Sequence, residues 1–351
     1  MSSDSRDAER THQQDGGPSH LVLAQLQAEV RDLRAYVAAL EVNLRNVTVR
    51  GRLRRLCAAL VGARLHKLDQ YRSRPVRVPA AYHRTKPPAD PPLISIVTPS
   101  YNQGRFLEET IKSVLDQNYP RLEYAIQDGG SKDESAALIE KYRAKLVHGE
   151  SRRDKGQGNA INLGFDHARK GEIMAYLNSD DLLLPGSLNY VASYFAAHPE
   201  VDVVYGHRVI VDHHTQEVGR WVLPAHSEKM LLWADYVPQE TMFWRRRIWD
   251  KAGGKIDESF QFALDWDLLL RFRDAGARFK RLPRFLGAFR IHPSQKTSAE
   301  LSSTGTPEMQ RIRHRLHGDT VTMDNIRANL RGYMIAHAWH NWLYRLGIAH
   351  Q

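Results

Sequence analysis

Strand-like and helix-like patterns alternate along the chain from Leu93 onward, and this alternation limits the fold more than any other feature. Short apolar runs at residues 93–97, 122–126 and 173–177 predict buried strands. Helical spacing of apolar residues separates these runs, and Pro185 stands where a first helical turn tolerates it. The pattern predicts an α/β domain with a largely parallel sheet, followed by helices at 309–316 and 323–346.

Polar clusters come directly after the predicted strands. Asp128 follows the second strand, an Asn-Ser-Asp-Asp run ending at Asp181 follows the third, and Asp265 and Asp267 lie farther along. Ligands of such sheets bind at the carboxyl ends of the strands, so we expect a site there. Paired carboxylates suit Mg²⁺ or Mn²⁺, although the same residues could cap a helix or form a turn.

Positive charge is concentrated in one short segment of the chain. The formal net charge is +10, and residues 45–87 hold 12 Lys and Arg against a single Asp. The remainder is close to neutral, so the high isoelectric point does not indicate a nucleic-acid partner. Residues 51–68 alternate arginines with leucines, which predicts a basic amphipathic helix on an anionic membrane surface or, alternatively, docked on the protein itself.

The segment before the basic helix has a heptad pattern. Apolar residues recur from Leu23 to Val47 at spacings of three and four, which favours self-association through a coiled coil over packing of this helix on its own domain. We divide the chain into a disordered tail (1–18), a coiled-coil helix (19–49), a basic helix with a Pro-rich linker (50–92), the α/β domain (93–298) and a helical extension (299–351).

The location predicted for the protein is the cytoplasm. A single cysteine, Cys57, excludes an internal disulfide and a Cys-rich zinc site. The sequence has no run approaching the roughly 20 apolar residues that span a bilayer. We expect a peripheral contact through the basic helix at the inner face of the cell membrane.

Eight ordered blocks between residues 93 and 298 resemble the family-2 glycosyltransferases. They are ISIVTPSYNQGRFLEETIKSVLDQNYP, YAIQDGGSKDES, KGQGNAINLGF, IMAYLNSDDLLLPGSL, DVVYG, PQETMFWRRRIWDKAGG, DWDLLLR and FRIHPSQKTS. The resemblance implies a GT-A fold, in which a Rossmann-like nucleotide-binding mixed sheet is flanked by helices, and inverting transfer from a nucleotide sugar. The Gln-x-x-Arg-Trp block and membrane helices of processive synthases are absent from the sequence, which favours a non-processive enzyme.

The same resemblance implies the donor site. The loop that lines the nucleotide base would carry Thr98, Pro99, Tyr101 and Asn102. Asp128 would accept the imide N–H of a uracil or thymine base, which favours a UDP or dTDP sugar. Lys155 would lie near the diphosphate, where Gly156 and Gly158 allow close backbone approach; the alternative is a surface lysine in a flexible loop.

The metal site implied by the resemblance is of the Asp-x-Asp type. Asn178, Ser179 and Asp180 occupy it, with an uncharged amide in place of the first carboxylate. Asp180 would be the principal ligand of Mg²⁺ or Mn²⁺, and His292 would complete the site.

The catalytic base implied by the resemblance is Asp265. Its neighbour Leu264 stands where many relatives have Glu, and Asp267 fits a helix start or a salt bridge better. Gln239 and Trp266 would lie near the sugar or the acceptor, a hydroxyl of a glycan or lipid-linked glycan, although a buried aromatic ring is the commoner role for tryptophan.

Two other functions remain open from the sequence. A nucleotidyltransferase would usually carry a Gly-rich basic triphosphate loop near the first strand, and residues 98–106 lack one. A catalytically decayed coiled-coil scaffold would be consistent with Asn178 and Leu264.

Overall fold

The computed structural model describes residues 68–292, 295, 301–318 and 321–348 of the 351-residue chain. The predicted tail, the coiled coil and the basic helix (51–68) lie outside these residues, except for Leu68. Among the described residues, we find no helix with the length and apolar character needed to cross a bilayer.

The strands form one mixed sheet with the order β1-β8-β7-β9-β5-β2-β3-β4, and β10 pairs with β7 and β6. The strands are Arg74–Pro75 (β1), Ile94–Ser100 (β2), Leu122–Asp128 (β3), His148–Ser151 (β4), Ile173–Tyr176 (β5), Leu182–Leu183 (β6), Val203–Val211 (β7), Gln216–Trp221 (β8), Phe243–Arg245 (β9) and Phe279–Arg290 (β10). β2 pairs in parallel with β3 and β5, whereas β9 lies antiparallel between β5 and β7. The mixed sheet expected from the resemblance is confirmed.

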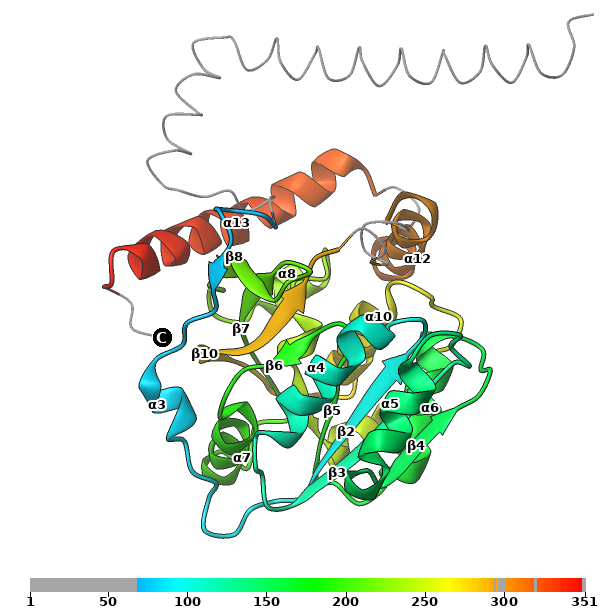
Figure 1. The fold of residues 1–351 in the computed structure, drawn as a ribbon. Coiled ribbons are helices and arrows are strands. Elements are labelled where there is room, and N and C mark those ends of the chain that lie inside the picture. Colours follow the sequence, from blue (N-terminus) through cyan, green and yellow to red (C-terminus); the bar gives the residue numbers. More distant parts are fainter. Residues whose placement is uncertain (1–67, 293–294, 296–300, 319–320, 349–351) are drawn as a thin grey trace, which may run out of the picture. The chain divides into compact units, whose positions relative to one another are not determined.

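Helices cover both faces of the sheet (Figure 1). They are Ala80–His83 (α3), Gly104–Leu115 (α4), Ser135–Tyr142 (α5), Gln157–His167 (α6), Ser187–Ala197 (α7), Glu228–Leu231 (α8), Arg246–Lys251 (α9), Leu264–Asp274 (α10), Thr306–His317 (α12) and Met323–Arg345 (α13). Short helical turns span Arg143–Lys145, Gln239–Thr241 and Leu301–Gly305. Every second strand residue faces the same side, as a strand requires. Val97 belongs to the apolar cluster that contains residues of α6, α9 and α10, whereas Ile96 belongs to the one that contains residues of α4, α5 and α7.

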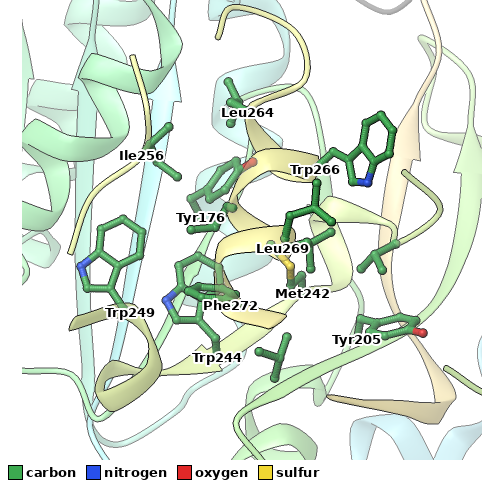
Figure 2. Packing of buried hydrophobic residues seen from close by; sticks show 14 of the residues in the cluster. Tyr176, Tyr205, Met242, Trp244, Trp249, Ile256, Leu264, Trp266, Leu269 and Phe272 are labelled. Carbon is green, nitrogen blue, oxygen red and sulfur yellow. The ribbon is translucent and has the colours of Figure 1, made fainter. Parts of the chain in front are cut away.

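Aromatic rings fill the core beneath α10 (Figure 2). Trp244 is fully buried, with its ring centroid 5.9 Å from that of Trp249 and 5.6 Å from that of Phe272. Burial of rings this large contributes several kcal/mol to folding, because truncating a buried Trp or Phe typically costs about 3–5 kcal/mol. The position of α10 on the sheet is therefore set by this aromatic packing.

Several predicted elements differ in extent from the observed ones. β2 runs three residues beyond the expected strand, and its Pro99 lies past the last β2–β5 pair at Val97, where a missing N–H is tolerated. β7 is one continuous strand from Val203 to Val211, because β10 pairs along its length. α7 begins after Pro185, because Gly186 adopts a left-handed conformation (φ 71°) against the Tyr82 carbonyl.

The Pro-rich stretch before β2 packs on the domain. Tyr82 of α3 is buried beneath the guanidinium of Arg284, 3.9 Å from its ring centroid, and Arg74 pairs with Glu217 of β8. Its prolines do not keep it apart from the domain, because Val76, together with Tyr82, adds to an apolar cluster there.

The C-terminal helices are those that the sequence predicts, and α13 runs along the outside of the fold (Figure 1). Its inner face buries Ile326, His337 and Asn341. Burial lowers the pKa of His337 to about 4, and His340 adds a smaller effect in the same direction.

Acid should weaken the folded state through His337. Because the folded state binds this proton less tightly than the unfolded chain, the stabilisation is complete above about pH 6.5 and declines as the pH falls toward 4. The shift corresponds to at most about 3 kcal/mol. We expect His337→Gln to reduce the loss of melting temperature between about pH 7 and about pH 5. The exposed His83→Gln serves as the control, and equal losses in both variants would contradict this prediction.

Candidate active site

The turn after β5 carries Asn178, Ser179 and Asp180, and α4 holds it in place. The hydroxyl of the buried Thr110 donates to the carbonyl oxygens of Ser179 (2.9 Å) and Asp181 (2.8 Å). The Ser179 side chain is itself buried, so it is not exposed to a nucleotide sugar. The turn is thus fixed by contacts to its backbone, which leaves the Asp180 side chain partly exposed.

Arg290, the last residue of β10, is the second anchor of this turn. Its side chain is fully buried; Nε donates to the Asp180 carbonyl (2.8 Å), and its backbone N–H donates to the Asp181 carboxylate (3.0 Å). The guanidinium also binds Thr215 (2.7 Å) and pairs with Glu109 of α4 (2.7 Å). One side chain therefore joins the turn, β10, α4 and the loop after β7.

Asp180 and His292 meet at the carboxyl ends of β5 and β10. The Asp180 Oδ2 lies 3.1 Å from His292 Nε2, although 112 residues separate them in sequence. The His292 ring packs on Phe106, and Asp180 keeps a 14% exposed side chain. Burial raises the pKa of the neighbouring Asp181 carboxyl well above its usual range, and the charge of Asp180 raises it further.

The residues at this point fit a divalent cation. A carboxylate oxygen and an imidazole nitrogen converge, and both are ligands that Mn²⁺ accepts. Among the described residues, we find no group of three acidic, histidine or cysteine side chains that could hold a metal. Two protein ligands match the usual arrangement in which phosphate and water oxygens fill the other positions of Mg²⁺ or Mn²⁺.

Asn178 links the turn to two further segments. Its Oδ1 accepts from Gln157 at the start of α6 (2.8 Å), and its Nδ2 donates to Gln239 Oε1 (3.1 Å). Gln239 also donates to the Tyr176 carbonyl (2.6 Å). The structure therefore brings Gln239 next to the Asp-x-Asp position, and both Asn178 hydrogen-bonding atoms are engaged within the protein.

Lys155 is exposed in the loop that enters α6. Gly156 adopts φ 110°, and its N–H donates to Asp154 (2.8 Å). Gly156 and Gly158 allow close approach of protein segments: a Cβ on Gly156 would lie 3.0 Å from Gln261, just ahead of α10. The amino end of α6, which favours negative charge, thus lies beside the segment that carries Asp265.

Asp128 is fully buried at the end of β3. Its carboxylate accepts four hydrogen bonds, from the backbone of Gly130 and Ser131 and from the hydroxyls of Ser131 and Ser151. No carboxylate oxygen is open to a base in this structure. Asp128 holds the 129–131 loop, which differs from its expected contact with the base.

The expected base-lining loop begins later than predicted. Thr98 and Pro99 belong to β2 and are buried, so the prediction that they lie on the loop is wrong for these two residues. Tyr101 is 64% exposed, and Asn102, at φ 52°, accepts from the Lys132 N–H. The extra length of β2 places two of the four expected residues in the strand and not in the loop.

Asp265 lies in the first turn of α10 and is partly buried. Leu264 and Trp266 on either side point into the core (Figure 2). Trp266 is fully buried, and its indole donates to the Leu231 carbonyl (2.7 Å), so the expectation that its ring meets a sugar is corrected. Asp267 pairs with Arg271 (2.8 Å), as expected for a salt-bridge residue.

Glu308 of α12 holds the loop that leads into α10. Its carboxylate accepts the backbone N–H groups of Gln261 (2.7 Å), Phe262 (2.8 Å) and Ala263 (2.8 Å). Arg315, also on α12, binds Asp267 (2.7 Å). The C-terminal extension therefore positions the segment that carries Asp265, with negative charge where the amino end of a helix favours it.

The sequence reasoning missed three positioning residues: Thr110, Arg290 and Glu308. Arg290 lies within the FRIHPSQKTS block, two residues before His292, which was a usable signal. Thr110 and Glu308 act on backbone groups far along the chain, and the sequence pattern carries no sign of such contacts.

The fold and the site define an α/β enzyme with ligand groups at the carboxyl ends of its strands. Residues 95–254 match the family model "Glycosyl transferase family 2". An uncharacterized glycosyltransferase of Rickettsia typhi is 28% identical over 221 residues, covering 60% of this chain and 68% of that protein. S. aureus TarS 1-349, solved in complex with UDP-GlcNAc, has a TM-score of 0.50 at 17% identity and covers 73% of this chain and 92% of its own.

Two longer relatives match only in part. Chondroitin synthase of Escherichia coli is 28% identical over 53% of this chain, and the match covers 27% of that protein. The O-antigen biosynthesis protein RfbC of Myxococcus xanthus is 31% identical over 57% of this chain and 16% of its own. Residues 95–254 form a family-2 glycosyltransferase domain, and the fold is of the GT-A type.

Glu308→Gln should lower kcat while the protein remains folded. The amide keeps the shape but can accept through only one oxygen, and charge-assisted bonds contribute roughly 1.5–3 kcal/mol each. We expect a loss of kcat with a small change in donor KM, measured by release of the nucleoside diphosphate. Glu140→Gln, on the exposed side of α5, is the matched control. Wild-type kcat in Glu308→Gln would contradict the positioning role.

Proposed function

We propose that the protein transfers a sugar from a nucleoside diphosphate donor to a glycan or lipid-linked hydroxyl, with inversion and with a divalent metal. The observation that carries this proposal is the 3.1 Å contact between Asp180 and His292 at the strand ends. These two side chains would hold Mg²⁺ or Mn²⁺, and the metal, when bound, neutralises charge on the departing diphosphate.

The diphosphate would lie between this pair and the loop before α6. Lys155 supplies a positive charge there, and the amino end of α6 supplies backbone N–H groups. The hydrogen bonds of Asn178 to Gln157 and Gln239 hold the turn after β5 against the start of α6 and the Gln239–Thr241 turn. Gln239 is largely buried, which supports a role in holding Asn178 near the sugar more than one in binding the acceptor.

Asp265 would act as the general base. The acceptor oxygen forms a bond to the anomeric carbon as the bond to the diphosphate oxygen breaks, and the hydroxyl proton passes to the Asp265 carboxylate. The first turn of α10 carries two acidic residues, and Asp265 is the partly accessible one. Leu264, where many relatives have Glu, is buried in the core. Asp267 is committed to two arginines, Arg271 and Arg315.

The donor base would be a pyrimidine, as UDP or dTDP, read by Tyr101 and Asp154. A Cβ on Gly129 would lie 3.1 Å from the Tyr101 ring and 3.2 Å from Asp154 Oδ1, so ring and carboxylate converge above this glycine. A base could stack on the exposed ring, and the carboxylate could accept its imide N–H. Asp154 would thus take the role that the resemblance implied for Asp128.

The roles of Asp180 and Asp265 are tested by conservative variants. Asp180→Asn and Asp265→Asn should each lower sugar transfer by about 10²-fold or more, because charge stabilisation or proton acceptance is lost. The assay measures release of nucleoside diphosphate from a panel of nucleotide sugars. Asp166→Asn, an exposed change on α6, should remain active. Release of pyrophosphate instead would indicate a nucleotidyltransferase.

Metal removal tests the remaining part of the site. A chelator should abolish transfer, and Mn²⁺ or Mg²⁺ should restore it. His292→Ala should raise the metal concentration needed for half-maximal activity by about tenfold or more. His213→Ala, an exposed histidine, is the control; full activity of the wild type in chelator would contradict the proposal.

Donor specificity tests Asp154. In Asp154→Asn the acceptor of the imide N–H becomes an amide that can donate as well, so the preference for UDP and dTDP over GDP should fall by about tenfold. Competition of free nucleotides measures this preference, with Asp166→Asn as the control. An unchanged preference would show that Asp154 does not read the base.

A further inference from the structure

The outer face of α13 is apolar and exposed. Ile335, Trp339 and Leu346 are 62%, 54% and 54% exposed. Trp342 stacks on Trp339 with ring centroids 4.9 Å apart. On a helix with 3.6 residues per turn these four residues share one side, and we call them the outer stripe.

The opposite side of α13 attaches the helix to the domain. Ile326, His337 and Asn341 are buried there, and the Tyr344 hydroxyl accepts a hydrogen bond from Arg220 of β8 (2.6 Å). The outer stripe is therefore not needed to dock this helix. Two tryptophans and two aliphatic side chains in water make a costly surface unless it has a partner.

Positive charge borders the outer stripe. Arg327, Arg331 and Arg345 are exposed on α13, and Arg327 pairs with Asp324. The sequence has no Asp or Glu from Asn325 to its last residue, Gln351. The surface is thus apolar and aromatic, with cations along one border.

We propose that the outer stripe of α13 binds an anionic lipid surface, with the helix lying in the plane of the interface. Tryptophan prefers the membrane interface, aliphatic side chains enter the acyl boundary, and arginines attract anionic headgroups. A second copy of the chain is a poorer partner, because an antiparallel two-fold contact through this face would set arginines of one helix near those of the other. The inference does not depend on the proposed transfer reaction.

Sedimentation with lipid vesicles tests this inference on the full chain. Wild type should pellet with phosphatidylcholine vesicles that contain phosphatidylglycerol, and less with phosphatidylcholine alone. The double variant Ile335→Ser, Trp339→Ser should bind the anionic vesicles about fivefold less or weaker still. Arg331→Gln with Arg345→Gln should weaken binding to the anionic vesicles more than binding to phosphatidylcholine alone.

Controls separate lipid binding from other effects. Val147→Ser removes an exposed apolar side chain away from α13 and should bind vesicles as wild type does. Melting curves and circular dichroism check that the variants fold. Wild-type vesicle binding by the Ile335, Trp339 variant would overturn the inference, because residues 45–87 alone would then carry the binding. A change of mass in light scattering without a change in vesicle binding would assign the stripe to a second copy and overturn it as well.

Discussion

The site depends on the burial of one cation, Arg290. A guanidinium taken fully out of water costs several kcal/mol unless its donors and its charge are satisfied. The Arg290 guanidinium donates hydrogen bonds to the Asp180 carbonyl and to Thr215, and it forms an ion pair with Glu109. Its backbone N–H also donates to the Asp181 carboxylate. These contacts hold β10, α4 and the 178–181 turn together. His292 follows two residues later, so the same constraint brings its ring to Asp180.

A second constraint comes from the C-terminal extension. The family match ends at residue 254, yet Asp265, His292 and Glu308 all lie beyond it. Glu308 binds three successive N–H groups ahead of α10, and the aromatic core around Trp244 fixes the rest of that helix. The matched segment supplies most strands of the sheet, whereas β10, the candidate base and the imidazole come from the chain that follows. The geometry of the site thus requires both parts.

The sequence predicted the elements that follow from local pattern. Alternating apolar runs located the strands, and the order of motif blocks indicated that Asp180 and His292 share a site, which their contact supports. The burial of individual side chains could not be predicted from the sequence. We expected Trp266 and Thr98 to contact ligands, but packing places both in the core. Asp128 likewise serves its own loop. Contacts from a side chain to a distant backbone group, such as those of Glu308, produce no periodic pattern in the sequence. The coiled coil at 23–47 and the basic helix at 51–68 stay predictions.

We propose above all that Asp180 and His292 hold a metal that in turn holds the diphosphate. Isothermal titration calorimetry of UDP and dTDP, with and without Mn²⁺, measures this without an acceptor or a known sugar. We predict binding to wild type that requires Mn²⁺ and that falls by about tenfold or more in His292→Ala. Nucleotide binding of equal affinity in the presence of a chelator would contradict the claim.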